Sequence, residues 1–283
     1  MKPLWLLGAP GASGIAHSPS PAMHNAGLVA LGQQPVYALY PCIDDELDAS
    51  LDAAERTCRG INVTAPYKVR VAARYAAVLD DDARAAGAVN TVVYGDEPMA
   101  SDTVAKNTDV AGLVDCWRRS NFHVEGRTIA VIGAGGAARA VVVAAHRAQA
   151  RAIVVHARRL SEARVIIALA EQLGLEAMAA DRVASRSVAL VVVATSALEN
   201  AGTWLDHALA HPAAVHDLRY GARAHAIRDA ALARGHLFAD GTLLLFAQGR
   251  LALASFTGMA VTDDAATAMR RALRLSLATP ALP

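Results

Sequence analysis

Short apolar runs alternate with longer amphipathic segments along most of the chain. The runs are bounded by glycine, proline or polar residues, which predicts buried strands, and the longer segments predict helices. Strands are expected at residues 4–7, 36–40, 61–63, 90–94, 129–132, 152–156, 175–179, 188–194 and 214–218, and helices at 22–31, 45–55, 68–75, 110–119, 161–173 and 224–234. Residues 243–277 have an almost continuously helical pattern. This alternation predicts an α/β fold with a parallel sheet.

The clearest motif follows the expected strand at residues 129–132. Gly133 and Gly135, with Ala138 in the third position, have the G-x-G-x-x-G/A spacing of a dinucleotide-binding turn. Gly133 allows the tight turn, Gly135 lets the backbone approach a pyrophosphate, and Ala138 lets the following helix pack on the strand. The free N–H groups at the start of that helix form an anion site. The alternative is a helix start between packed elements that binds no ligand.

The end of the next expected strand, at residues 152–156, bears on the choice of dinucleotide. In folds of this type an acidic residue at this position binds the ribose 2′-hydroxyl of NAD, whereas an arginine accommodates the 2′-phosphate of NADP. Here the strand is followed by Arg158 and Arg159, and no acid is present. NADP is therefore favoured over NAD, with the alternative that Arg159 is only a solvated charge.

Other polar clusters lie at the ends of expected elements. Two prolines are expected to hold Ser18 and Ser20 on a stiff extended segment with both hydroxyls on one side, which suits a polyol or a carboxylate. The alternative is a serine that caps the helix at 22–31. Lys68 begins a helix, a position that the helix dipole disfavours for a cation. Thr108 or Asp109 could simply cap the helix at 110–119.

Apolar and polar positions also alternate in residues 61–64, which predicts a strand with one apolar and one polar face, ended by Pro66. Thr195 follows the strand expected at 188–194, and so lies at the carboxyl end of a parallel strand, where such sheets hold their ligands.

Composition narrows the class of function. The 283 residues exceed the usual size of one domain, so two domains that share a cleft are expected. An apolar content of 54% with a net charge of +1 argues against nucleic-acid binding and favours a small ligand. No apolar run is long enough for a membrane span, and the first eight residues predict a strand rather than a signal peptide.

Cysteine and histidine usage adds two further expectations. The three cysteines are far apart and form no C-x-x-C pair, which fits reduced thiols in a cytoplasmic enzyme: Cys42, Cys58 and Cys116. The ten histidines show no metal-ligand spacing, so no metal is expected.

Six clusters together resemble the shikimate dehydrogenase family in their order and spacing. They are residues 17–21 (HSPSP), 62–68 (NVTAPYK), 87–91 (GAVNT), 107–109 (NTD), 133–137 (GAGGA), and Asp240-Gly241 with Gln248. The resemblance covers nearly the whole chain. It implies an α/β protein with a mixed N-terminal substrate domain of residues 1–108 with 241–283, and a doubly wound Rossmann NADP domain of residues 109–240. The C-terminal helices would pack back on the first domain.

The resemblance also implies roles for individual residues. Lys68 and Asp109 would be a catalytic acid–base pair for NADPH-dependent reduction of 3-dehydroshikimate to shikimate, because removing hydride from a secondary alcohol also requires a proton acceptor for the hydroxyl. The substrate would be bound by Ser18 and Ser20 at its carboxylate, by Thr64, Asn90 and Gln248 at its ring hydroxyls, and by Tyr220. The cofactor would contact Gly133, Ala134, Gly135, Gly136, Ala137, Arg158, Arg159, Thr195, Leu218 and Gly241.

The chain departs from the family pattern mainly in the segments expected near the cofactor. The departures include residues 193–198, Val110 after the catalytic aspartate, and Leu243-Leu244 after Asp240-Gly241. A quinate or aminoshikimate dehydrogenase of the same family therefore stays open, as does a regulator that binds NADPH without catalysis. The sequence leaves a monomer and a homodimer as alternatives, and does not decide between aromatic biosynthesis and quinate catabolism.

Overall fold

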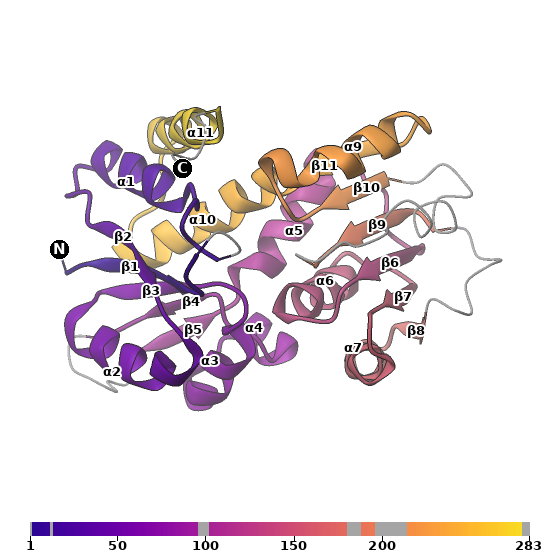
Figure 1. Cartoon of the computed structure of the whole chain (residues 1–283), viewed down its shortest axis with the longest axis horizontal. Coiled ribbons are helices and arrows are strands. Elements are labelled where there is room, and N and C mark those ends of the chain that lie inside the picture. The colour runs from indigo at the N-terminus through magenta and orange to yellow at the C-terminus, as the bar shows by residue number, and fades with distance from the viewer. Residues whose placement is uncertain (1, 12–13, 96–101, 180–187, 196–213, 279–283) are drawn as a thin grey trace. The chain divides into compact units, whose positions relative to one another are not determined.

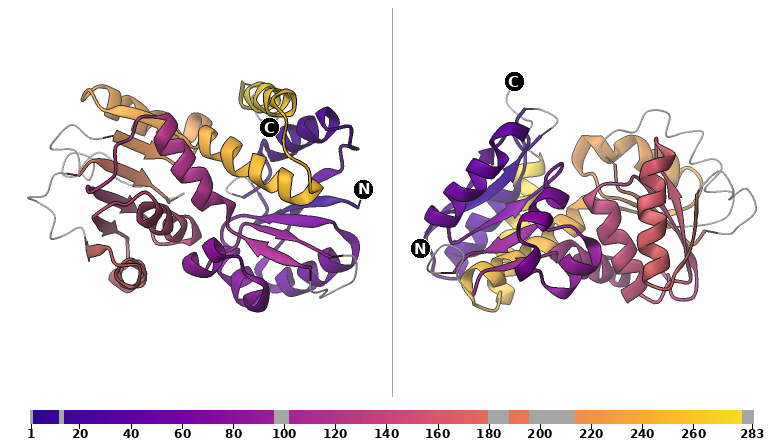
Figure 2. Two further views of the ribbon diagram at one scale, coloured as in Figure 1. Left: turned by 180° about the vertical axis from the view of Figure 1, so that it is seen from behind. Right: turned by 90° about the horizontal axis from the view of Figure 1, so that it is seen from below.

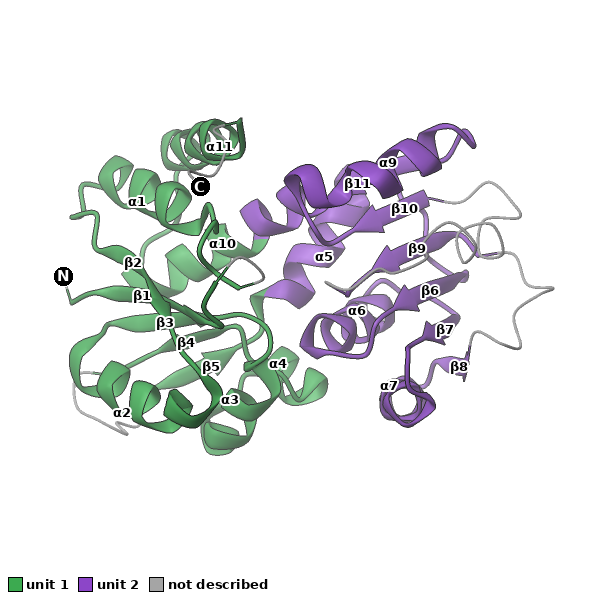
Figure 3. Ribbon diagram, viewed as in Figure 1, with its two compact units in different colours: residues 1–108, 248–283 green, residues 109–247 purple. Residues whose placement is uncertain are grey.

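The computed structural model describes residues 2–11, 14–95, 102–179, 188–195 and 214–278 (Figure 1). The chain forms two compact units, one of residues 1–108 with 248–283 and one of residues 109–247 (Figure 3). The sequence placed the second boundary between residues 240 and 241. The units divide between 247 and 248, inside helix α10 (Gly241–Thr257).

The first unit is built on a five-stranded mixed sheet in the order β2-β1-β3-β4-β5. Its strands are β1 (Leu4–Gly8), β2 (Tyr37–Pro41), β3 (Gly60–Val63), β4 (Thr91–Val93) and β5 (Val104–Lys106). β1 pairs in parallel with β2 and β3, whereas β4 runs antiparallel to β3 and to β5. The predicted mixed sheet is confirmed.

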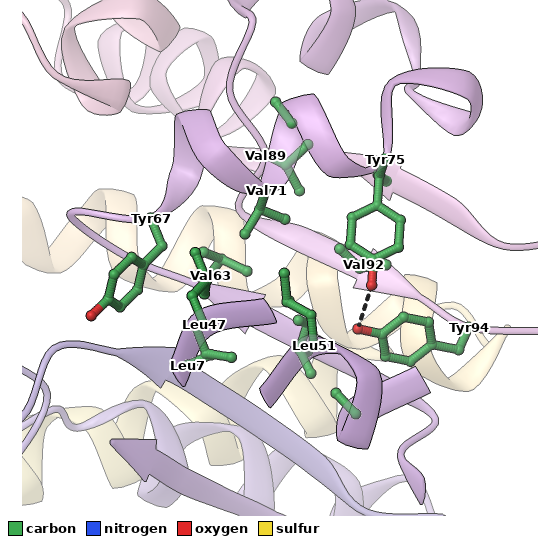
Figure 4. Close-up of a cluster of buried hydrophobic side chains, with 14 of the residues drawn as sticks. Leu7, Leu47, Leu51, Val63, Tyr67, Val71, Tyr75, Val89, Val92 and Tyr94 are labelled. Atoms are coloured by element: carbon green, nitrogen blue, oxygen red, sulfur yellow. Dashed lines mark hydrogen bonds between the residues drawn. The ribbon is translucent and has the colours of Figure 1, made fainter. Parts of the chain in front are cut away.

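Helices and buried side chains cover this sheet. The helices of this unit are α1 (Ser20–Ala30), α2 (Leu47–Thr57), α3 (Lys68–Arg74), α4 (Asp81–Ala86), the part of α10 from Gln248 onward, and α11 (Asp263–Ala278), which packs on α1. Short 3-10 turns lie at Asp44–Glu46 and Ala76–Val78. The apolar cluster drawn in Figure 4 includes Leu51 from α2, Val71 from α3 and Val92 from β4. The phenol oxygens of Tyr75 and Tyr94, 3.2 Å apart, form a hydrogen bond at its margin.

The C-terminal helices return to this first unit, as predicted. α11 lies beside α1 in both views of Figure 2 and is in extensive contact with it. The long helical pattern is interrupted between Thr257 and Asp263, and the N–H of Ala265 donates to the Thr262 hydroxyl at 3.2 Å, which satisfies a free donor at the start of α11.

The second unit contains a six-stranded parallel sheet in the order β11-β10-β9-β6-β7-β8. Its strands are β6 (Thr128–Ile132), β7 (Ala152–His156), β8 (Glu176–Ala179), β9 (Leu190–Val193), β10 (Ala214–Asp217) and β11 (Leu237–Asp240). Strands of a parallel sheet are covered on both faces, which explains the continuous apolar runs. The order reverses between β6 and β9, the position at which doubly wound sheets bind ligands.

The helices of the second unit are α5 (Thr108–Arg119), α6 (Gly136–Arg147), α7 (Leu160–Gln172) and α9 (His225–Leu232), with a 3-10 turn at Gly221–Ala224. α6 and α7 contact each other and lie against β6, β7 and β8 (Figure 2). Ala138 of α6 is fully buried, as the third position of the glycine motif requires. The predicted doubly wound domain is confirmed.

Four details differ from the sequence-based expectation. The three-residue β5 and the edge strand β11 were not expected. β3 has no exposed polar face, because Asn62 is only 5% exposed and its amide is hydrogen bonded inside the unit. The segment before α1 is a turn rather than an extended stretch, and α1 begins at Ser20 with Pro21 in its first turn. A cap role for Thr108 or Asp109 is wrong, because α5 begins at Thr108.

Two further observations concern composition. Among the described residues, no helix is both long and apolar enough to cross a membrane. All three cysteines are buried and carry free thiols.

Candidate active site

The glycine-rich turn in the second unit has the features of a backbone cradle. Gly133 has φ 118°, and a Cβ at this position would lie 2.6 Å from the Ala194 carbonyl oxygen, so only glycine fits between the ends of β6 and β9. At Gly135 a Cβ would meet nothing within 4 Å. α6 begins at the next residue, so its free N–H groups lie beside this open position. The turn therefore fits the pyrophosphate of a dinucleotide.

The other residues predicted to contact the cofactor follow the carboxyl ends of neighbouring strands. Thr195 follows β9, Leu218 follows β10, and Gly241 follows β11. The N–H of Leu218 donates to Val193 at 2.9 Å, and the N–H of Gly241 donates to the Arg219 carbonyl at 2.8 Å. These strands and β6 are neighbours in the parallel sheet, so the residues lie together with the glycine-rich turn at the carboxyl ends of the strands.

Arg158 and Arg159 come directly after β7, the strand next to β6. Both are exposed. Arg159 forms an ion pair with Glu162 one turn into α7, whereas Arg158 has no ion-pair partner among the described residues. Arg158 is therefore the guanidinium more readily available to a phosphate group.

In the first unit, Asn90 is the centre of a buried polar network. It is 3% exposed, and its Oδ1 accepts a hydrogen bond from the N–H of Thr108 at 2.8 Å. Its Nδ2 lies 2.9 Å from the Thr108 hydroxyl and 3.4 Å from Oε1 of Gln248, on α10. Two of the three side chains predicted to bind ring hydroxyls, Asn90 and Gln248, are thus brought together.

Lys68 and Thr64 lie on the segment that leads from β3 into α3. The N–H of Val89 donates to the Lys68 carbonyl at 2.9 Å, which connects the start of α3 to the residue before Asn90. Lys68 is half-buried. The N–H of Thr64 donates to the Leu7 carbonyl at 3.0 Å. Asp109, 7% exposed, follows Thr108 in the first turn of α5.

Ser18 and Ser20 form a compact pair of hydroxyls. The Ser18 hydroxyl donates to that of Ser20 at 3.1 Å and accepts from the Ser20 N–H at 3.3 Å. The extended segment expected here is therefore wrong, although the two hydroxyls are close together. The capping alternative is also wrong, because the residue before α1 is Pro19 and no cap side chain is hydrogen bonded to the start of the helix.

Tyr220, the remaining residue predicted to bind substrate, lies in the loop after β10. It directly follows Arg219, whose guanidinium is hydrogen bonded to both carboxylate oxygens of Asp217. All the other predicted substrate residues belong to the first unit, and all the predicted cofactor residues belong to the second.

Besides Thr108 of α5, three strand residues of the Asn90 network were not predicted as site residues. They are Tyr37, Asn62 and Thr91, and all three are buried. A signal for them exists in the sequence, because a polar residue inside a short apolar strand needs a buried hydrogen-bond partner.

A family model described as "Shikimate dehydrogenase substrate binding domain" matches residues 11–92. A "Shikimate dehydrogenase (NADP(+))" from Rubrobacter xylanophilus is 35% identical over 287 residues, which cover 95% of this chain and 94% of the relative. The chain belongs to the shikimate dehydrogenase family. The family predicted from the six clusters is thereby confirmed.

Solved structures of the shikimate dehydrogenase family have the same fold. A shikimate 5-dehydrogenase from Thermus thermophilus, in complex with shikimate, superposes with a TM-score of 0.82 at 29% identity and covers 99% of this chain and 100% of its own. The same enzyme in complex with NADP(H) and shikimate superposes with a TM-score of 0.75 at 29% identity, covering 98% and 100%.

Proposed function

We propose that this member of the shikimate dehydrogenase family catalyses the reversible, NADP-dependent reduction of 3-dehydroshikimate to shikimate. The observation that carries the proposal is the match, over 95% of this chain and 94% of the relative, to a protein named shikimate dehydrogenase (NADP(+)). The separation of polar residues supports it. A dinucleotide-type turn lies in one unit. The other contains two hydrogen-bonded pairs suited to a polyhydroxylated acid, the hydroxyls of Ser18 and Ser20 and the amides of Asn90 and Gln248.

The residues of the glycine-rich turn fit NADP. The open position at Gly135 and the start of α6 would hold the pyrophosphate, and Arg158 would hold the 2′-phosphate. When bound, the nicotinamide of NADP accepts hydride from the alcohol carbon or returns it to the ketone.

The acid–base chemistry is assigned to Lys68 and Asp109. Oxidation of a secondary alcohol breaks a C–H bond, which releases hydride, and an O–H bond, which releases a proton. Lys68 takes that proton from the hydroxyl in oxidation and returns it to the ketone oxygen in reduction. Asp109 orients the substrate hydroxyl. Ser18 and Ser20 bind the carboxylate, and Thr64, Asn90, Gln248 and Tyr220 bind the ring oxygens.

The test is to incubate the protein with NADP and, separately, shikimate, quinate and aminoshikimate, and to follow the absorbance of NADPH. We expect the highest kcat/KM with shikimate. Preference for quinate or aminoshikimate would replace the substrate assignment but keep the reaction. Binding of NADPH without turnover of any of the three would favour the regulator and reject the proposed activity.

A further inference from the structure

Hydrogen bonds inside the first unit determine which way the Asn62 amide points. Asn62, in β3, donates from Nδ2 to the Asn90 carbonyl oxygen at 3.1 Å. A carbonyl oxygen can only accept, so the nitrogen of Asn62 must be on this side. Its Oδ1 accepts from the hydroxyl of Tyr37 at 2.8 Å. Every polar atom of this buried amide therefore has a partner.

The direction of the next hydrogen bond follows from the first. Nδ2 of Asn62 also donates to the Thr91 hydroxyl oxygen at 2.9 Å, so the hydrogen of that hydroxyl is directed elsewhere. It points to Oδ1 of Asn90, 3.1 Å away. Thr91 is fully buried, so water does not compete for this bond.

The Asn90 side chain is thus fixed by two donors on the same atom. The N–H of Thr108 and the hydroxyl of Thr91 both donate to Oδ1, at 2.8 Å and 3.1 Å. The amide nitrogen must therefore face the opposite way, where it donates to the Thr108 hydroxyl at 2.9 Å and lies 3.4 Å from Oε1 of Gln248. The second distance leaves room for a stronger acceptor.

We propose that Thr91 and Asn62 are positioning residues that hold Asn90 with its N–H group, rather than its oxygen, directed at the substrate. This inference rests on the proposed function, in which Asn90 binds a ring oxygen. An N–H donor suits a redox reaction on a polyhydroxylated ring. Hydroxyl and ketone oxygens both accept hydrogen bonds, whereas a ketone oxygen cannot donate one. Asn90 can then donate a hydrogen bond to the substrate in both oxidation states without a flip of its side-chain amide.

The experiment compares Thr91→Val, which has the same shape without the hydroxyl, with Thr91→Ser, which keeps the hydroxyl. Loss of one buried hydrogen bond corresponds to an about three- to tenfold effect on an equilibrium. We expect Thr91→Val to raise the KM for shikimate, and the Kd measured by calorimetry, by about that factor. Both kcat and the KM for NADP should stay within about twofold, because the contact is made equally before and during the reaction.

Thr91→Ser should restore the KM of the wild type. A matched control is Thr128→Val, since Thr128 is also a buried strand residue, 1% exposed, and its hydroxyl has no partner among the described residues. Thr128→Val should leave every kinetic constant unchanged. An equal rise in KM for Thr91→Ser, or a KM for Thr91→Val that equals that of the wild type, would overturn the proposal.

Asn62→Asp provides an independent variant if Thr91→Val folds poorly. A carboxylate at position 62 cannot donate, so it draws the Thr91 hydroxyl hydrogen away from Asn90. The KM for shikimate should rise in the same range, and adding Thr91→Val should not raise it further. If the rise in KM of the double variant equals the product of the two single effects, the proposed hydrogen-bond chain from Asn62 through Thr91 to Asn90 is rejected.

The variants are compared with the wild type on whichever of shikimate, quinate and aminoshikimate it oxidises. Inactivity of the wild type on all three rejects the proposed function. An active wild type with an unaffected Thr91→Val variant rejects only the positioning role.

Discussion

Arg219 binds both carboxylate oxygens of Asp217, two residues before it in the chain. Its Nη2 is 2.6 Å from Oδ2 and its Nε is 3.0 Å from Oδ1, while the Arg219 N–H also donates to Oδ1 at 3.0 Å. The Asp217 side chain is completely buried. Burial raises the pKa of Asp217, and the bonds to Arg219 lower it without cancelling the effect of burial. The ion pair joins the residues on either side of Leu218 and fixes the loop before Tyr220.

Arg219→Met should destabilise the protein strongly, because it leaves the buried Asp217 carboxylate without its cationic partner. We expect the free energy of unfolding in urea to fall by about 3–5 kcal/mol. The control is Arg118→Met: Arg118 pairs with Asp115, but its side chain is 76% exposed, and we expect a loss under about 1 kcal/mol. The double variant Asp217→Asn/Arg219→Met should recover part of the loss, and equal effects of the two single variants would contradict this account.

Alanine at Gly133 should lower the stability of the protein, whereas alanine at Gly135 should lower its affinity for NADP. At Gly133 the positive φ and the contact with Ala194 predict a loss of stability of about 1–3 kcal/mol. At Gly135 the Cβ has free space, so the melting temperature should not change, whereas the KM for NADP should rise about tenfold or more. Calorimetry and NADP titration of both variants test this. A stable Gly135→Ala with unchanged KM would remove Gly135 from the cofactor site.

Arg158 and Arg159 should contribute unequally to the choice of cofactor. Arg158→Ala should raise the KM for NADP about 10- to 100-fold, the range for losing a hydrogen bond to a charged group, with little change for NAD. Arg159→Ala should have the smaller effect, because that guanidinium is paired with Glu162. Replacing both should affect NADP much more than NAD. Equal effects on the two cofactors would reject the assignment of the 2′-phosphate site.

Lys68→Ala should lower kcat by roughly 10²–10⁴-fold with a modest change in the KM for shikimate, as expected for loss of a positioned acid–base group. Lys68→Arg should not restore activity, because a guanidinium stays protonated and cannot accept the proton. Asp109→Asn should affect both kcat and KM. A change in KM alone for Lys68→Ala would make the lysine a binding group and direct the search for the proton acceptor to Asp109.

His24 should make the protein less stable in acid. It is 1% exposed and stacks on Tyr37 with ring centroids 4.3 Å apart, and neither ring nitrogen has a hydrogen-bond partner among the described residues. Burial lowers the pKa of His24 from 6.5 to about 3. Between these values the unfolded chain binds a proton that the folded chain does not, so the free energy of unfolding falls as the pH falls, by up to about 1.4 kcal/mol per pH unit.

His24→Phe keeps a ring on Tyr37 and removes the titrating group. Urea unfolding at about pH 7 and about pH 5 should therefore show a smaller loss of stability in acid for the variant than for the wild type. The variant should also be at least as stable at about pH 7, because two unpaired buried nitrogens are removed. An identical loss of stability in acid for both proteins would contradict the prediction.

The periodic apolar pattern was sufficient to predict the central strands and the edge strands β2 and β8, and insufficient for the other two edge strands, β5 and β11. β7 was predicted with its observed bounds, Ala152–His156, because it is buried on both faces. β5 has three residues and β11 is an edge strand with Leu237 58% exposed, so neither has a distinct apolar run. Ser20 was misplaced because the two prolines were taken to exclude a helix, although proline is favoured in a first turn.

The residues of the candidate site also fall into two groups, those that the sequence indicates and those that depend on strand pairing. Lys68, Asn90 and the glycine-rich turn could be proposed from the sequence because their clusters are local and ordered along the chain. The support of Asn90 by Thr91 and Asn62 depends on strand register, in which Asn62 lies opposite Thr91, and register is set by pairing across distant segments. The register therefore cannot be predicted from the residues of one segment alone.

The packing of α1 against α11 constrains the order in which the chain can fold during synthesis. A ribosome releases residues 109–247 before the partner of α1 has been made, so the second unit, which is continuous in sequence, can fold while translation proceeds. In the first unit, α1 has no α11 to pack against until residues 263–278 emerge. The nascent protein thus passes through a stage with one finished nucleotide-type domain and one exposed apolar helix, at which a chaperone has a defined segment to protect.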